Sequence, residues 1–370
     1  MENSKIESIM NNVVQELKQE GFLNNNNQND SNSDILERMD GLTNFTFKFI
    51  DAQSASPRIA RWALDDFEGF MNRDTERLVL KTLEECNLYP KIHFYGKKLK
   101  VEDFIKNDGT LEKKDLLQDS SQLKILNQAL RKVYTKITPK LLSNKTKVSK
   151  MIFFIKNFKQ KKTKILENIK FFVSKEKLNN YTKIFTELEK YCEDLEKYHA
   201  LIKSPLVITH GDLNPFNILK IQKNERENDL QIIDYEYAGP NLILYDIANL
   251  VHELQSEYSP QFSIFEVKSP ANRISEDSEL ENQIDCVIES FRQSFADFLD
   301  EYSREEFLEL VYGFRAYNFF FWICLTIDSE KMSQGLDFDF YNCANLRFQQ
   351  FIESFKILEN FFNTKYKKIL

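Results

Sequence analysis

Two short apolar runs, Leu206–Ile208 and Leu230–Ile233, each lead directly into an acidic motif. Apolar runs of this length, bounded by polar residues, are typical of buried strands. The first run delivers a His-Gly-Asp sequence that ends at Asp212, and Asn217 follows five residues later. The second run ends at Asp234. The pattern therefore predicts two strands that carry a small set of acid and amide side chains into loops.

These side chains suit phosphoryl transfer. Such a reaction needs a group that accepts or orients the proton of the attacking hydroxyl, and oxygen ligands that hold Mg²⁺ against the phosphates of ATP. Asp212 suits the first task, and Asn217 and Asp234 suit the second. Each residue alone is more typical of an ordinary turn, and we expect His210 to support the loop by bonding its backbone. The complete spacing favours a Mg²⁺- and ATP-dependent kinase that acts on a hydroxyl group.

The chain around this motif divides into regions of different pattern. Residues 1–37 combine an amphipathic helix at 4–22 with an Asn-rich segment that we expect to be a mobile loop. Residues 38–107 are β-rich and predict a nucleotide-binding N-lobe, and residues 108–370 predict a catalytic and acceptor-binding C-lobe. The expected fold class is α+β, a bilobal protein-kinase-like fold with a small antiparallel-sheet N-lobe and a larger, mainly helical C-lobe. The expected strands lie within 41–63 and at 91–95 and 98–103, and the expected helices at 72–87, 122–138, 153–173 and 178–201.

Composition limits the other classes of function. The net charge of −7 argues against nucleic acid as the main partner. Five scattered cysteines without a CxxC pair indicate a reduced, cytoplasmic protein. We find no signal sequence and expect no stable membrane insertion, since no segment looks apolar over the roughly 20 residues needed to cross a bilayer. Residues 145–177 are rich in lysine, which we interpret as a solvated basic helix face rather than a membrane- or phosphate-binding surface.

The segment 230–253, LQIIDYEYAGPNLILYDIANLVHE, resembles the choline/ethanolamine kinase family, whose pattern is I-D-[FY]-E-Y…N…[FY]-D-I-x-N…E. The resemblance implies the aminoglycoside-phosphotransferase version of the kinase fold, Mg²⁺ and ATP as cofactor and co-substrate, and a small amino alcohol as acceptor. It also admits a homodimer, because members of the family are often dimers. The residues in register with the pattern are Asp234, Glu236, Tyr237, Asn241, Asp246, Asn249 and Glu253, of which Asp246 and Asn249 are expected to support the site.

The resemblance extends into the N-lobe, where it implies the ATP-binding residues. Thr43 and Asn44 belong to a sequence similar to the family's phosphate-covering loop. Arg61 stands where the family places a basic residue on a strand, and Glu76 is its expected partner. The remaining two expected ATP-binding residues lie in a segment that resembles the hinge, whose backbone would meet adenine; they are Glu102 and Phe104.

An alkylammonium acceptor requires aromatic faces and a nearby carboxylate. The resemblance implies such a set from several parts of the C-lobe. For its Trp and Phe residues, ordinary helical core is the alternative interpretation. The expected substrate-binding residues are Glu236, Tyr237, Glu253, Tyr258, Trp322, Phe338 and Phe340.

Departures from the family pattern keep the acceptor open. Gly211 stands where the family usually has Asn, Asp40 replaces one glycine of the phosphate loop, Leu325 replaces the second Trp of a W-x-x-W pair, and Cys343 stands where an aromatic is common. The cues for choline and ethanolamine conflict, and the sequence favours choline by a small margin. Alternatives are an aminoglycoside, amino sugar or homoserine acceptor on the same fold, and a catalytically silent nucleotide-binding protein.

Overall fold

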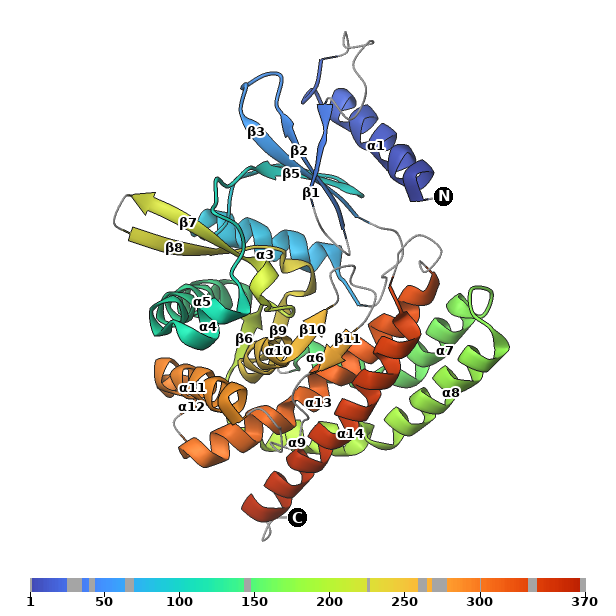
Figure 1. Ribbon diagram of the computed structural model, residues 1–370, viewed down its shortest axis with the longest axis vertical. Coiled ribbons are helices and arrows are strands. Elements are labelled where there is room, and N and C mark those ends of the chain that lie inside the picture. Colours follow the sequence, from blue (N-terminus) through green and yellow to red (C-terminus); the bar gives the residue numbers. More distant parts are fainter. Residues whose placement is uncertain are drawn as a thin grey trace. The chain divides into compact units, whose positions relative to one another are not determined.

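Two units, each with a core of its own, make up the chain in the computed structural model (Figure 1). The first contains Met1–Glu68 and Leu80–Asn107, and the second contains Gly69–Val79 and Asp108–Leu370. The structure describes residues 2–24, 35–39, 44–63, 70–142, 148–224, 227–258, 265–267, 278–299, 301–331 and 338–366. The first unit holds an antiparallel sheet and the second is mainly helical, so the expected fold class is confirmed.

The first unit is a five-stranded antiparallel sheet covered by one helix. Helix α1 (Glu2–Gln19) places Ile9, Val13 and Leu17 on one stripe at helical spacing, and this stripe packs on the sheet core. Within β2, Phe47 and Phe49 point into that core, because alternate residues of a strand face the same side. The strands in sheet order are β1 (Glu37–Met39), β2 (Asn44–Ile50), β3 (Pro57–Ala63), β5 (Leu99–Asp103) and β4 (Ile92–Tyr95).

Helix α3 (Arg73–Glu85) begins directly after Asn72, whose side-chain oxygen accepts a hydrogen bond from the backbone N–H of Thr75 at 2.9 Å. Asn72 is therefore the N-cap of this helix. Two other predicted helices are each broken into two. At Asn157 the side chain donates to the carbonyl of Phe153 (2.8 Å), which competes with continued helix. At Tyr191 the backbone N–H bonds to Leu188 in a tighter turn.

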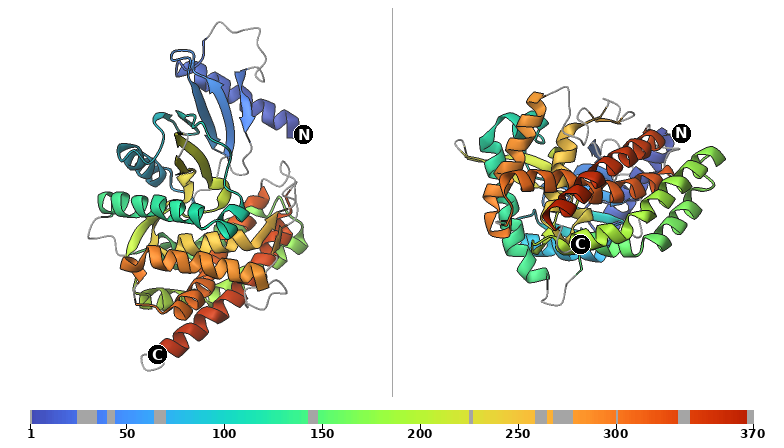
Figure 2. Two further views of the ribbon diagram at one scale, coloured as in Figure 1. Left: turned by 60° about the vertical axis from the view of Figure 1, so that its left-hand side comes forward. Right: turned by 90° about the horizontal axis from the view of Figure 1, so that it is seen from below.

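Two long helices of the second unit pack along each other, and one of them, α13, is buried over most of its length (Figures 1 and 2). Helices α13 and α14 lie side by side in both views and in their contacts. The helices are α4 (Lys113–Gln118), α5 (Ser120–Leu141), α6 (Lys150–Lys156), α7 (Phe158–Ile169), α8 (Lys175–Lys190), α9 (Cys192–Leu201), α10 (Leu244–Gln255), α11 (Ser278–Ser294), α12 (Ala296–Leu299), α13 (Arg304–Asp328) and α14 (Phe340–Lys365).

Every residue of α13 from Leu310 to Asp328 is buried, as expected for a helix inside a large core. Within the described residues, the stretch Arg304–Lys331 is the one helical segment that is long and apolar enough to span a membrane by length and composition. The sequence analysis missed this stretch. Its apolar window is wholly buried in the second unit, so core packing accounts for its composition.

Two strand pairs position the loops that carry the acidic motifs. Strand β6 (Leu206–Thr209) pairs with β9 (Gly239–Leu242), and β7 (Ile218–Asn224) pairs with β8 (Glu227–Ile232). Because Thr209 lies opposite Gly239 and Ile218 lies opposite Ile232, the loops 210–217 and 233–238 are tied together at both ends. The short segments in this unit also include η1 (Pro215–Asn217), η2 (Tyr235–Tyr237) and the pair β10 (Ser256–Tyr258) and β11 (Phe265–Val267).

Candidate active site

The carboxylate of Asp246, in the first turn of α10, fixes the start of the loop 210–217. It is fully buried and accepts hydrogen bonds from the backbone N–H groups of His210 (2.8 Å) and Gly211 (2.9 Å) and from the hydroxyl of Tyr134 (2.7 Å). Burial raises the pKa of Asp246, and His210 and these donors oppose that rise. Three donors on one buried carboxylate leave this end of the loop little freedom to move.

The ring of His210 joins the two loops. Its Nδ1 accepts from the backbone N–H of Asp212 (3.2 Å), and its Nε2 lies 2.7 Å from the carbonyl oxygen of Ile233. Both contacts are satisfied by a neutral imidazole with its hydrogen on Nε2. Burial lowers the pKa of His210, which favours this neutral form. The ring thus links Asp212 to the residue that precedes Asp234.

Asn217 holds Asp212 from the other end of the same loop. Its Nδ2 donates to the backbone carbonyl of Asp212 (3.0 Å) and to the carboxylate oxygen Oδ2 (3.1 Å). The backbone N–H of Asn217 is itself held by Oδ1 of Asn214 at 3.1 Å. Since the amide nitrogen is used in these bonds, the amide oxygen is the atom left to serve as a metal ligand.

Asp234 has a left-handed backbone, with φ 66° and ψ 61°. Few residues other than glycine adopt this conformation, although Asp tolerates it better than most. The left-handed residue turns the chain sharply from β8 into η2, so that Asp234 lies at the start of the loop that faces Asp212. Such outliers often occur at functional sites.

The loops and α10 bring four acidic residues close together. Burial raises the pKa of Asp212 well above its usual range, and like-charge repulsion from Glu253, Asp234 and Glu236 raises it further. A cluster of this sign favours cations, either Mg²⁺ or a cationic acceptor. No three His, Cys, Asp or Glu side chains of the described residues are grouped to hold a metal.

An aromatic group lies beside the acidic cluster. The indole N–H of Trp322 donates to Oδ1 of Asn249 (2.8 Å), and Nδ2 of Asn249 donates to the carbonyl of Leu213 (3.1 Å). Asn249 thereby ties Trp322 to the loop that contains Asp212. The ring of Tyr237 lies 5.3 Å from that of Trp322 and 5.9 Å from that of Phe321, both in edge-to-face geometry.

A small cavity adjoins this group, with a volume of about 10 Å³ that suits about one water molecule. The hydroxyl of Tyr237 is buried and has no hydrogen-bond partner among the residues that the structure describes. A buried hydroxyl without a partner is costly, which makes it a candidate for bonding a ligand. The residues that line the cavity are Lys150, Met151, Gly211, Tyr237, Asn241, Tyr245 and Phe321.

The sequence analysis missed Phe321 and Lys150. Phe321 is one of many aromatic residues on a helix that is buried all round, so no local pattern distinguishes it. Lys150 belongs to the lysine-rich region, where a single buried lysine has no signature. Its Nζ donates to the carbonyl of Tyr237 (2.8 Å) and lies 5.9 Å from the ring centres of Tyr237 and Phe321.

Three further residues were expected to bind the acceptor: Phe338, Phe340 and Tyr258. Phe338 and Phe340 pack on each other at the start of α14, with ring centres 4.8 Å apart. Arg347 of α14 lies over the ring of Trp322 at 5.6 Å, so the protein's own cation covers part of that ring. The side chain of Tyr258 lies outside the described residues.

In the first unit, Arg61 donates from Nε to Glu102 at 2.8 Å, and Glu102 also accepts from the hydroxyl of Tyr89 at 3.0 Å. Burial alone would raise the pKa of Glu102, but Lys100 and Arg61 lower it to about 2.

Phe104, another expected ATP-binding residue, lies under the ammonium group of Lys48 at 4.9 Å. Thr43 and the side chain of Asn44 lie outside the described residues. In the second unit, Glu76 accepts from Arg73 at 2.6 Å, and its pairing with Arg61 stays a prediction.

The sequence model of the family described as choline/ethanolamine kinase matches residues 36–352. The chain belongs to the choline/ethanolamine kinase family. Human ethanolamine kinase 1 is 31% identical over 155 residues, which cover 40% of this chain and 31% of that protein. Ethanolamine kinase of Saccharomyces cerevisiae is 26% identical over 239 residues, which cover 59% of this chain and 44% of that protein. The chain therefore aligns with less than half the length of these relatives.

Solved structures of the choline/ethanolamine kinase family share the fold. Ethanolamine kinase of Plasmodium vivax superposes with a TM-score of 0.67 at 18% identity, covering 93% of this chain and 87% of that one. Choline kinase of Cryptosporidium parvum superposes with a TM-score of 0.63 at 19% identity, covering 95% and 96%. The expected family and its kinase fold are thus confirmed.

Lys150 leads to a prediction for this member of the family. Burial lowers its pKa from the usual 10.5 to about 8, against the opposing charges of Glu236 and Glu76. Between about pH 8 and 10.5 the unfolded chain holds this proton and the folded chain does not, so stability rises with pH in that window. We expect the free energy of unfolding of the wild type to gain about 1 kcal/mol per pH unit there relative to Lys150→Met.

Urea denaturation of both proteins at several pH values from 7 to 10 measures this difference. Exposed Lys132→Met on α5 is the control and should show no such slope relative to the wild type. A constant difference between the wild type and Lys150→Met across the window would show that Lys150 titrates normally.

Proposed function

We propose that this chain transfers the γ-phosphoryl group of ATP to the hydroxyl of ethanolamine or choline, with Mg²⁺ as cofactor. The product would be the phosphorylated amino alcohol used in phospholipid synthesis. The observation that carries the proposal is the contact of the His210 ring with the carbonyl of Ile233, which ties the loop of Asp212 and Asn217 to the residue before Asp234. An acidic and aromatic neighbourhood for a cationic acceptor lies directly beside them.

Asp212 would accept the proton of the acceptor hydroxyl as the oxygen attacks the γ-phosphorus. Its raised pKa makes it a stronger base than an exposed carboxylate, and Asn217 holds its orientation. The amide oxygen of Asn217 and the carboxylate of Asp234 are the atoms that would hold Mg²⁺. Bound Mg²⁺ would supply neutralisation of the charge that develops on the phosphates.

On the family pattern, we assign ATP binding to the residues that the sequence analysis named for it. The buried pair of Arg61 and Glu102 supports this assignment in part, because it gives the sheet a fixed guanidinium. Arg61 would steer the phosphates, and the backbone around Glu102 would meet adenine. The other assigned residues are Thr43, Asn44, Glu76 and Phe104.

The structure changes the balance between the two acceptors. The ammonium group of choline carries methyl groups and no N–H, whereas the ammonium of ethanolamine donates hydrogen bonds. The unpartnered hydroxyl of Tyr237 and the neighbouring carboxylates Glu236 and Glu253 suit a donor. The ring of Trp322 is partly covered by Arg347, which weakens an aromatic cage for methyl groups. We therefore propose ethanolamine as the preferred acceptor.

A panel of acceptors in a coupled ADP-release assay tests this function. Ethanolamine and choline are compared with an aminoglycoside, an amino sugar and homoserine, each with and without Mg²⁺. We expect turnover of both amino alcohols only with Mg²⁺, and a higher kcat/KM for ethanolamine. Turnover of another acceptor alone would reassign the substrate, and ATP binding without any transfer would indicate a silent nucleotide-binding protein.

We also propose a cytoplasmic location for the protein, and a homodimer stays a prediction.

A further inference from the structure

Two adjacent phenylalanines project from the turn between α7 and α8. Phe171 is 82% exposed and Phe172 is 44% exposed, although both are large apolar side chains. They are the one adjacent pair among the exposed large apolar side chains of the described residues. Single exposed apolar residues are common, but an adjacent pair of this exposure indicates an interaction surface.

The turn that carries these rings is well ordered. The backbone N–H of Phe172 donates to the carbonyl of Ile169 at 2.8 Å, and that of Lys170 donates to Leu166 at 3.2 Å. On the other side, the hydroxyl of Ser174 accepts from the N–H of Lys177 at 3.2 Å and caps α8. The rings are therefore held outward by a fixed backbone and need little ordering to bind.

Helices α7 and α8 lie side by side as an antiparallel hairpin, with this turn at one end (Figures 1 and 2). The apolar positions of α7 that face its own unit, Ile165 and Ile169, are already buried. The core of the hairpin is thus complete without Phe171 and Phe172, and their apolar surface is left for a partner.

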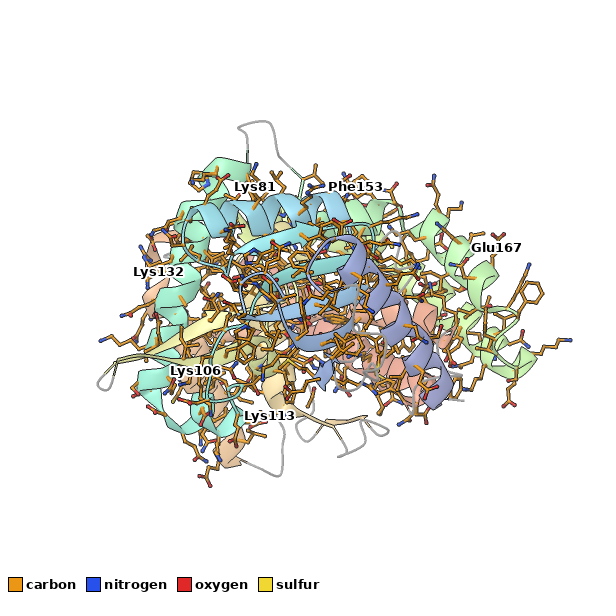
Figure 3. The ribbon with its side chains drawn as sticks, turned by 90° about the horizontal axis from the view of Figure 1, so that it is seen from above. Lys81, Lys106, Lys113, Lys132, Phe153 and Glu167 are labelled. Atoms are coloured by element: carbon orange, nitrogen blue, oxygen red, sulfur yellow. The ribbon has the colours of Figure 1, made fainter. Side chains whose placement is uncertain are left out.

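The surroundings of the turn are basic although the chain is acidic. Residues 164–177, around the turn, contain four lysines and two acids, Glu167 and Glu176, whereas the whole chain has a net charge of −7. Exposed Lys164, Lys170 and Lys175 flank the turn. The ammonium of Lys170 lies 4.9 Å from the ring centre of Phe171, so charge and ring are presented together. Glu167, an exposed acid of α7, lies at the surface of this hairpin (Figure 3).

We propose that this hairpin tip, defined as Lys164, Lys170, Phe171, Phe172 and Lys175, binds the surface of a bilayer that contains anionic lipids. The exposed rings thus change the interpretation of this part of the lysine-rich region, which the sequence alone indicated as a solvated face. The two rings would enter the boundary between headgroups and acyl chains, and the lysines would contact lipid phosphates and carboxylates. A bilayer offers both requirements at once, an apolar layer and a negative surface above it. An acidic protein surface would complement the charge of the lysines, but acidity alone would not bury the two protruding rings.

Co-sedimentation of the full chain with vesicles tests the proposal. Vesicles of phosphatidylcholine alone are compared with vesicles that also contain phosphatidylserine, at low and high salt. We expect binding only with phosphatidylserine, weakened by salt because the lysine contacts are screened. Phe171→Ser combined with Phe172→Ser should lower the partition coefficient by about tenfold or more, and Lys170→Glu combined with Lys175→Glu should do the same.

Matched controls separate the tip from general surface effects. Lys132→Glu combined with Lys136→Glu makes the same charge change on exposed positions of α5, where Lys132 lies at the surface (Figure 3). Leu78→Ser removes another large apolar side chain, which is 53% exposed. Both controls should bind vesicles as the wild type does. Thermal unfolding checks that each variant folds, and the single variant Phe171→Ser replaces the double one if that does not.

Three results would overturn the proposal. They are absence of wild-type binding to vesicles with phosphatidylserine, equal binding to phosphatidylcholine alone, and equal loss of binding in tip and control variants. Because sedimentation does not depend on turnover, these results are independent of the acceptor panel.

Discussion

Asp212→Asn is expected to lower kcat by about 10³-fold, since a general base typically contributes 10²- to 10⁴-fold. Asn is nearly the same size and keeps an oxygen that can accept from Nδ2 of Asn217, so the loop should stay in place. The substitution also removes a buried charge that Glu253, Asp234 and Glu236 disfavour. Stability should therefore be unchanged or higher while turnover falls. Coupled ADP release and thermal unfolding measure the two effects on the same samples.

The control for this experiment is Asp297→Asn, which removes an exposed carboxylate that pairs with Arg131 on the surface of the second unit. It should leave kcat unchanged, because exposed ion pairs contribute little. Near-normal turnover of Asp212→Asn would contradict the proposed mechanism. A parallel loss of turnover and of folded protein would instead assign Asp212 a structural role.

The sequence predicted the strands and the loop motif because both depend on local pattern. The apolar runs before Asp212 and Asp234 fold as β6 and β8, and the spacing to Asn217 places it within reach of Asp212. The contacts that join the two loops could not be predicted from the local pattern. The contact from His210 to the carbonyl of Ile233 spans 23 residues, and only the paired strands bring these atoms together.

Burial was the harder property to predict. Lys150 looked like one more lysine of a solvated face, yet tertiary packing places its ammonium against the carbonyl of Tyr237. Phe321 and Trp322 are neighbours on a helix that is buried on every side, and the sequence distinguished Trp322 only through the family pattern. Periodicity identifies which helix is buried, but it does not identify which buried side chain faces a site.

The predicted long helices show a related limit. The apolar spacing continues through Asn157 and Tyr191, so the sequence indicates one helix where the structure has two. Both breaks depend on which hydrogen bonds the local groups make once neighbouring helices are packed. The periodicity of the apolar residues alone does not predict which of these hydrogen bonds form.

Gly211→Ala is expected to destabilise the protein by about 3 kcal/mol or more, from left-handed strain of about 1–2 kcal/mol and overpacking of about 1–3 kcal/mol. Gly211 has φ +86°, and a Cβ built there would overlap the carbonyl oxygen of Tyr237 and lie 2.8 Å from its carbonyl carbon. Asn, the usual family residue at this position, tolerates the φ angle but carries the same Cβ. Gly211→Asn should therefore also be destabilised, and both variants should lose turnover because Asp212 is the next residue.

Gly109→Ala is the matched control for this prediction. Gly109 has φ +96°, but a Cβ there would meet no atom within 4 Å. Its substitution should cost the backbone strain alone, about 1–2 kcal/mol in urea denaturation. The difference between the two alanine variants isolates the overlap with Tyr237. If that difference were zero, the loop of Asp212 would not be packed against the turn of Tyr237, and the proposed arrangement of base, metal ligands and acceptor residues would not hold.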